Sequence, residues 1–189
     1  MARPKRISDE AVLDAAIRVM LRTGPGGFTL AEAGREAGVS AATLLQRFGD
    51  KQSLIVRALT RDVSGFVARL DEAPAAPGRE AVLDLFWLIT PDTDDAEAFV
   101  DQLPWLREDF RNPQLNRLSR EMFTALRAAV AARLPPLPVS PEVAARLIEA
   151  QWQGAMNQWG FFQEGRLPDY VARALGEWFD AMEAAAPPA

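Results

Sequence analysis

Apolar residues recur three and four positions apart through most of the chain, which is the spacing of amphipathic α-helices. In the N-terminal part, residues that start and stop helices divide this pattern. The predicted helix caps are Ser8, Thr29, Ser40 and Asp50, and glycine marks the helix ends. The predicted helices run from Ser8 to Gly24, from Thr29 to Gly38, over residues 41–47 and from Lys51 to about Leu70.

Prolines divide the rest of the chain. Breaks are expected over residues 73–78, at Pro91, near Pro104 and at Pro113. Ser140 followed by Pro141 is a typical helix start, because proline lacks the N–H that the first helical turn leaves unpaired. Helices are predicted from there to about Glu164, and from Pro168 to about Ala185. No strand pattern stands out, so the sequence predicts an all-α protein of about nine helices.

Two short helices joined by a tight turn stand out over residues 29–54. The turn is Gly38-Val39-Ser40, where glycine permits a left-handed backbone conformation and valine can enter the core between the helices. Leu44 and Phe48 give the second helix an apolar face. Small residues that would let the helices approach closely are Ala33, Gly34 and Ala37. The pattern predicts a helix-turn-helix, whose second helix enters the major groove of DNA.

Charge is divided unevenly along the chain, whose net charge is −5. Residues 1–61 carry ten Lys and Arg against six Asp and Glu, a net charge of +4. Residues 62–189 carry eleven against twenty, a net charge of −9. This asymmetry indicates that one part of the chain meets a polyanion. The negative total therefore does not argue against DNA binding.

The chain contains no cysteine and no histidine. Disulfides, thiol nucleophiles, thiolate metal sites and imidazole bases or ligands are thereby excluded. We therefore expect no enzymatic activity, no cofactor and no metal. The longest stretch without a charged residue, 150–163, is shorter than the roughly 20 apolar residues of a membrane-spanning helix. The basic N-terminus leads into polar residues rather than a signal-peptide core, so we expect a cytoplasmic protein without a membrane partner.

Residues 8–56 resemble the DNA-binding head of the TetR/AcrR family of one-component transcriptional repressors. The resemblance rests on the order and spacing of Phe28-Thr29, Ala37-Gly38-Val39-Ser40, Thr43-Leu44, Phe48 and Lys51. It implies a helix-turn-helix DNA-binding domain over residues 1–54, with a connector helix continuing to about residue 70. Residues 55–189 would then form a ligand-binding and dimerisation domain. The resemblance further implies a homodimer that binds a near-palindromic double-stranded DNA operator and is released by a small organic inducer.

Three positions depart from the family pattern. Ala42 replaces a glycine, Leu45 an aromatic residue that is often tyrosine, and Arg47 a histidine or tyrosine. Leu45 cannot donate a hydrogen bond to phosphate, whereas the guanidinium of Arg47 suits phosphate or guanine. These departures leave an alternative open, a helical ligand-binding protein or enzyme whose head has lost DNA binding. Within regulation, an activator is the alternative to a repressor.

The candidate DNA-binding residues form three groups. Thr29 and Lys51 are expected at helix N-termini that face phosphates. The second helix of the motif supplies groove-side candidates, whose methyl groups suit thymine and whose Gln46 amide suits adenine. These candidates are Ser40, Ala41, Ala42, Thr43, Leu45, Gln46 and Arg47. The basic tail of Arg3, Lys5 and Arg6 is expected along phosphates or in the minor groove, the alternative being a solvated terminus.

The second part of the chain is rich in aromatic residues, and ligand sites are mostly apolar cavities with a few placed polar groups. The candidate ligand-binding residues are Phe86, Trp87, Trp105, Phe110, Phe123, Gln151, Trp152 and Asn157, each with a place in the core as its alternative. Small residues in the helix after Pro141 and a broad apolar stripe on the last helix predict a four-helix dimer interface. Its candidate residues are Leu147, Gly154, Ala155, Val171, Leu175, Trp178 and Met182.

Overall fold

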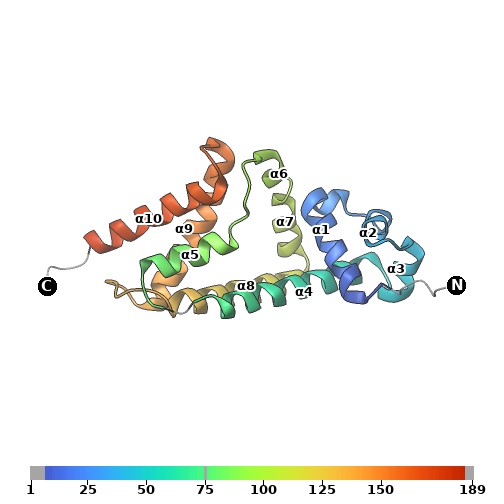
Figure 1. Ribbon diagram of the computed structural model, residues 1–189, viewed down its shortest axis with the longest axis horizontal. Coiled ribbons are helices and arrows are strands. Elements are labelled where there is room, and N and C mark those ends of the chain that lie inside the picture. The colour runs from blue at the N-terminus through green and yellow to red at the C-terminus, as the bar shows by residue number, and fades with distance from the viewer. Residues whose placement is uncertain (1–6, 75, 186–189) are drawn as a thin grey trace. The chain divides into compact units, whose positions relative to one another are not determined.

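The computed structural model describes residues 7–74 and 76–185. These residues form ten α-helices and no strand, which confirms the predicted all-α class (Figure 1). The helices are α1 (Asp9–Gly27), α2 (Leu30–Ala37), α3 (Ala41–Phe48), α4 (Lys51–Glu72), α5 (Arg79–Ile89), α6 (Ala96–Val100), α7 (Leu103–Arg111), α8 (Pro113–Ala131), α9 (Pro141–Phe162) and α10 (Leu167–Ala184). Across the described ranges, no helix has both the length and the hydropathy needed to cross a membrane.

The chain folds into two compact units. The first unit takes the residues up to Phe66 together with Val100–Glu121, and the second takes Val67–Phe99 and the residues from Met122 onward. Helices α4 and α8 each begin in the first unit and end in the second. The first unit therefore includes α7, whereas the sequence predicts residues 55–189 as one separate domain.

Helices α1 to α3 and the start of α4 enclose the core of the first unit (Figure 1). Phe28, Leu44 and Leu54 are its largest fully buried side chains. Leu115 and Leu118 of α8 join the same core, so this unit is completed by residues far along the chain. Burial of each large apolar side chain contributes about 1.5–3 kcal/mol, and α2 and α3 depend on it because each is only eight residues long.

Helix α1 is interrupted at Gly24, where the sequence predicts its end. Gly24 has a φ of 62°, and a Cβ atom there would lie 2.5 Å from the carbonyl oxygen of Asp101. Only glycine fits both the conformation and the space. The predicted end at Gly24 is too early, because the chain makes a further helical turn through Gly27.

Side chains from the α7 region donate hydrogen bonds to carbonyl groups beside the interruption of α1. Pro25 has no N–H for the carbonyl oxygen of Leu21, and the side-chain amide of Gln102 donates a hydrogen bond to that oxygen. Trp105 Nε1 donates to the carbonyl oxygen of Met20 at 3.3 Å. These bonds fasten the α7 region to the end of α1 within the first unit.

The second unit has its core between α5, α9 and α10, with Phe86, Trp159 and Phe179 fully buried (Figure 1). Helix α9 begins as predicted, with Ser140 as cap and Pro141 in its first turn. The helix is predicted to run to about Glu164 but ends at Phe162, because Gln163 adopts the left-handed conformation at φ 51°.

Candidate nucleic-acid interface

The helix-turn-helix is formed by α2 and α3, and side-chain caps determine where each helix begins. The Oγ1 of Thr29 accepts a hydrogen bond from the N–H of Glu32 at 3.1 Å. The Oγ of Ser40 accepts one from the N–H of Thr43, also at 3.1 Å. Gly38 ends α2 with a φ of 69°. Both predicted starts and the predicted stop are confirmed.

Gly34 brings α2 and the turn into direct backbone contact. A Cβ atom at Gly34 would lie 2.6 Å from the carbonyl oxygen of Val39 and 3.3 Å from the backbone nitrogen of Ala41. The N–H of Val39 donates to the carbonyl oxygen of Gly34 at 2.8 Å. The close approach predicted from the small residues is therefore confirmed at this position, and no other residue type leaves room for it.

Helix α3 is buried on one side and free on the other. Leu44 and Phe48 are buried in the core, as predicted. The opposite side exposes Ala42, Gln46 and Leu45, whose side chain is 45% exposed. The free surface of α3 is therefore uncharged and carries a single side-chain amide.

Arg47 lies outside this free surface. Its guanidinium forms an ion pair with Asp9 at the start of α1, with Nε 2.8 Å from the carboxylate, and only 13% of the side chain is exposed. The guanidinium also lies 5.6 Å from the ring centre of Phe48. The structure thus places Arg47 between α3 and α1, apart from the other groove-side candidates.

The phosphate-side candidates lie at two helix starts of the first unit. Thr29 is exposed at the start of α2, and Lys51 is exposed at the start of α4 with Nζ 5.6 Å from the ring centre of Phe28. Asp50 accepts a hydrogen bond from the N–H of Ser53 at 2.7 Å, and the hydrogen bonds from Ser53 lower the pKa of the Asp50 carboxyl. Arg3, Lys5 and Arg6 lie outside the described residues.

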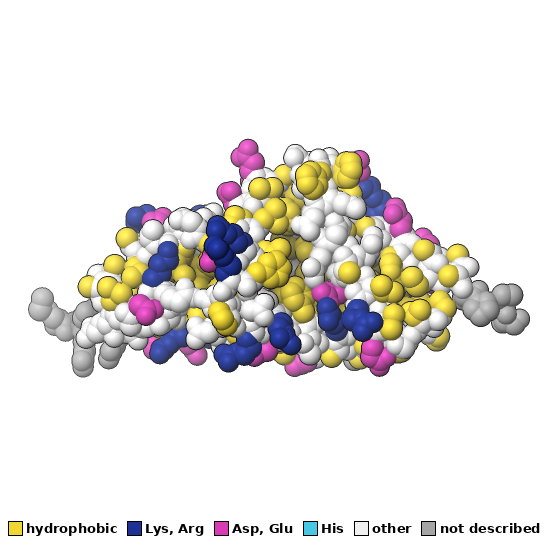
Figure 2. All heavy atoms as spheres, turned by 180° about the vertical axis from the view of Figure 1, so that it is seen from behind, with side chains coloured by type: hydrophobic (Ala, Val, Ile, Leu, Met, Phe, Trp, Pro, Cys, Tyr) yellow, Lys and Arg dark blue, Asp and Glu magenta, His cyan; other side chains and the backbone are white. Residues whose placement is uncertain are grey.

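Most arginines of the described N-terminal helices are paired with carboxylates. The ion pairs are Arg18 and Arg22 with Glu36, Arg35 with Glu32, Arg47 with Asp9, and Arg61 with Asp14 and Glu10. Hydrogen bonds from Arg18 and Arg61 hold the pKa values of Glu36 and Asp14, respectively, below their usual range. Lys51 and Arg57 instead lie over the rings of Phe28 and Phe48. These pairs occupy most of the arginines without changing the net charge of +4, because that sum already counts the carboxylates, and Figure 2 shows Lys and Arg interspersed with Asp and Glu.

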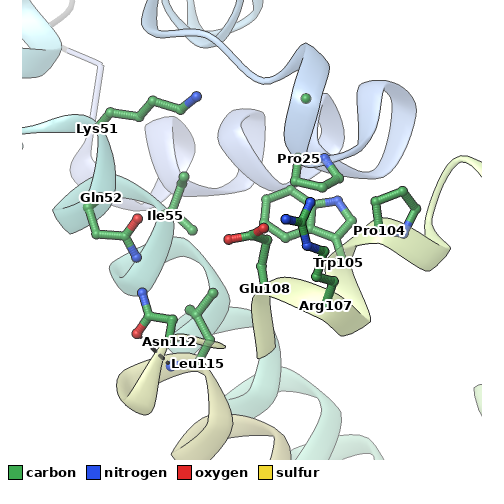
Figure 3. Close-up of a pocket in the computed structure, with 11 residues that line it drawn as sticks. Pro25, Lys51, Gln52, Ile55, Pro104, Trp105, Arg107, Glu108, Asn112 and Leu115 are labelled. Carbon is green, nitrogen blue, oxygen red and sulfur yellow. Dashed lines mark hydrogen bonds between the residues drawn. The ribbon is translucent and has the colours of Figure 1, made fainter. Parts of the chain in front are cut away.

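A pocket of about 400 Å³ lies in the first unit beside Lys51 (Figure 3). Trp105 and Pro25 line one side of it, and Figure 3 shows the carboxylate of Glu108 pointing into the space between α4 and α7. The remaining lining residues are Gly26, Gln52, Ile55, Pro104, Arg107, Asn112 and Leu115. Trp105 is thus the one predicted ligand-binding residue that lines this pocket.

The other ligand-binding candidates are dispersed. Phe110 is exposed on α7 in the first unit. In the second unit, Phe86 and Trp152 are buried with ring centres 5.7 Å apart, and Trp152 Nε1 donates to Thr90 Oγ1 at 2.9 Å. Trp87 lines a separate pocket of about 730 Å³ beside α5. Phe123 is half-buried on α8, and Gln151 and Asn157 are exposed on α9. The structure does not gather these residues around one cavity.

The dimer candidates divide by burial. Ala155, Val171 and Leu175 are buried within the protomer, where they pack α9 and α10 in the second unit. Exposed surface remains at Leu147, Gly154, Trp178 and Met182.

Two short capped helices with a glycine turn and a free second helix define a helix-turn-helix domain of the DNA-binding type. Residues 12–58 match the family model of the bacterial regulatory proteins of the tetR family. This match covers the helix-turn-helix head and confirms the resemblance seen in the sequence.

Relatives agree with this assignment. Over 167 residues the chain is 29% identical to the HTH-type transcriptional regulator BetI of Burkholderia thailandensis. The matched region covers 80% of this chain and 84% of BetI. A transcriptional regulator from Rhodococcus sp. Rha1 has the same fold with a TM-score of 0.75 and 21% identity, covering 96% of this chain and 100% of that one. The multidrug binding protein EbrR, solved in complex with malachite green, has a TM-score of 0.62 and 24% identity, covering 92% and 98%.

Proposed function

We propose that the protein is a ligand-responsive transcriptional regulator, a repressor that binds a near-palindromic operator as a homodimer and is released by a small organic molecule. The free face of α3 carries the proposal, because Leu44 and Phe48 anchor the helix while its far side remains open to a major groove. The tetR-family match of the head and the similarity to BetI support it. No catalytic role is proposed.

DNA binding is tested with an operator selected from random duplexes and measured by fluorescence anisotropy at several salt concentrations. Lys51→Ala is expected to weaken binding to all sequences alike and to reduce the salt slope by about 1, because one phosphate contact is lost. Gln46→Ala is expected to change base preference instead. The matched control is Arg69→Ala, at an exposed arginine in the second-unit part of α4. It should change neither the salt slope nor the base preference. Equal affinity of the wild-type protein for operator and scrambled duplex would overturn the proposed function.

Release by an organic effector is supported by the two pockets, one beside Lys51 and one beside Trp87. EbrR, whose fold is similar, binds malachite green, an organic dye. A ligand bound beside Lys51 would change the position of a proposed phosphate contact and so favour the DNA-free state. Thermal-shift screening of organic compounds, followed by operator release for each hit, tests this part of the proposal.

Dimerisation is supported by the free face of α9. Leu147, Gly154 and Phe161 recur seven residues apart, so they lie along one face of the helix. Leu147 is 43% exposed and Phe161 is 85% exposed, while a Cβ atom at Gly154 would meet nothing within 4 Å. Figure 2 shows hydrophobic side chains lying together near the C-terminal end of the described chain. A second copy on this face would give the two-fold symmetry that a palindromic operator requires.

Gly154→Trp is expected to convert the dimer to a monomer and to reduce operator affinity at least tenfold, because only one half-site is then held. The protomer itself should keep its stability, since the new ring enters open space. Light scattering and anisotropy measure the two effects. Glu72→Trp adds the same ring at an exposed end of α4 and is the control. A Gly154→Trp protein that remains a dimer with full operator affinity would place the interface elsewhere.

A further inference from the structure

We infer that α3 reads its half-site through thymine methyl groups and one adenine, without a guanine contact, and that Leu45 is the principal apolar reader. The inference rests on the proposed function and adds the class of sequence that the site recognises. It also assigns Arg47 the role of a positioning residue rather than of a base reader.

The chemistry of the free face of α3 limits which bases it can distinguish. Ala42 and Leu45 offer only aliphatic carbon, and the apolar group in the major groove is the C5-methyl of thymine. The hydroxyl of Thr43 lies 2.9 Å from the hydroxyl of Ser40, and the γ-methyl of Thr43 is a further aliphatic group that suits thymine. Gln46 is the single exposed amide, and its geometry matches the N6 and N7 atoms of adenine.

The missing guanine contact follows from the position of Arg47. Guanine is read chiefly by an arginine or lysine that donates to its O6 and N7 atoms. Arg47 is the one charged residue in the sequence of α3, and its guanidinium already donates to the carboxylate of Asp9. Withdrawing Arg47 for a base would leave Asp9 without this partner and would expose a side chain that is now only 13% accessible.

Arg47 also determines how α3 is held. Its guanidinium joins the last turn of α3 to the first turn of α1, and its contact with the ring of Phe48 places it against the core. The orientation of Leu45 and Gln46 toward the groove depends on this connection. Loss of Arg47 should therefore weaken binding to every sequence without altering base preference.

The test uses the full-length protein and the operator selected above. Each thymine of one half-site is replaced in turn by uracil, which lacks only the C5-methyl group, and each guanine by 7-deazaguanine, which lacks the N7 acceptor. We expect uracil at contacted positions to reduce affinity about fourfold for each methyl group removed, because each methyl group buries about as much apolar area as one methylene. We expect 7-deazaguanine to have no effect.

Variants assign these effects to residues. Leu45→Ala is expected to reduce operator affinity about tenfold and to abolish the response to uracil at one thymine, while Leu21→Ala, at an exposed leucine of α1, keeps that response. Arg47→Ala and Asp9→Asn should each weaken binding uniformly, with the uracil response retained. Circular dichroism confirms that each variant is helical before it is scored.

The outcomes separate this inference from the proposed function. Failure of selection to enrich any sequence contradicts the proposed function itself. An enriched operator that is indifferent to uracil overturns the present inference alone. The inference is also overturned if replacing a guanine by 7-deazaguanine weakens binding of the wild-type protein but not of Arg47→Ala. That result would show that Arg47 contacts the guanine.

Discussion

Gly34→Ala is expected to lower the free energy of unfolding by about 2 kcal/mol and to reduce operator affinity at least tenfold. The new methyl group would lie 2.6 Å from the carbonyl oxygen of Val39, an atom of the backbone that cannot rotate away. Overpacking of this kind costs about 1–3 kcal/mol and more against backbone, whereas the gain in helix propensity is about 1 kcal/mol. The turn must therefore open, and α3 moves relative to α2. Thermal unfolding and anisotropy with the selected operator measure the two losses.

The matched control for Gly34 is Gly26→Ala. Gly26 also lies in the first unit, but it is exposed and a Cβ atom there would meet nothing within 4 Å. Its substitution should leave both stability and operator affinity within the error of the wild-type values. If Gly34→Ala behaved like Gly26→Ala, the two helices would not be held at the distance that the structure shows.

Helix starts in this chain could be predicted because a cap is a local interaction. Ser8, Thr29, Ser40 and Ser140 each accept a hydrogen bond from the N–H three residues further along. A side chain, its acceptor atom and the first turn are then all visible in four consecutive residues. Gly34 belongs to the same group, since the small residue and the turn that it contacts lie within seven positions.

The partners of charged and aromatic residues could not be predicted in this way. Arg47 is 38 positions from Asp9, and nothing near Arg47 in the sequence indicates that a carboxylate occupies it. From its position in the motif, the sequence therefore predicts a DNA contact for Arg47. The aromatic ring of Trp105 makes it a ligand candidate, but no sequence pattern indicates that its Nε1 donates to a carbonyl of α1, 85 positions away. The type of a side chain limits the roles that it can have, and the tertiary structure shows which partner it contacts.

The same reason explains the charge of the head. A count of residues gives +4, but ion pairs such as Arg18 with Glu36 and Arg61 with Asp14 join different helices and are invisible to the count. The pairs join α1 to α2 and α4 and occupy these guanidinium groups, while the net charge of the head stays +4. The phosphate contact then falls on few groups, and this is why a single substitution at Lys51 is expected to be visible in the salt slope.

Arg133→Ala is expected to lower the free energy of unfolding by about 3 kcal/mol. Arg133 is 4% exposed and donates to four backbone carbonyl oxygens. Leu70, Ala73 and Pro74 supply three of them at distances of 3.2, 2.6 and 2.8 Å, at the end of α4 and just beyond it. Alanine would leave these carbonyl oxygens without a hydrogen-bond donor. Each buried acceptor left unpaired costs about 1–3 kcal/mol unless water replaces the donor.

The position of Arg133 at the C-terminal end of α4 adds a second contribution, because a cation there interacts favourably with the helix dipole. Arg133→Lys should therefore restore part of the stability, since an ammonium keeps the charge but cannot reach all four carbonyl oxygens. Thermal unfolding should show a midpoint lower by roughly 6–12 °C for Arg133→Ala. Arg146→Ala, an exposed arginine on α9, is the control and should shift it by less than about 2 °C. Equal midpoints for the two alanine variants would contradict the role of Arg133, because an arginine that holds the end of α4 cannot be as dispensable as one that lies in solvent.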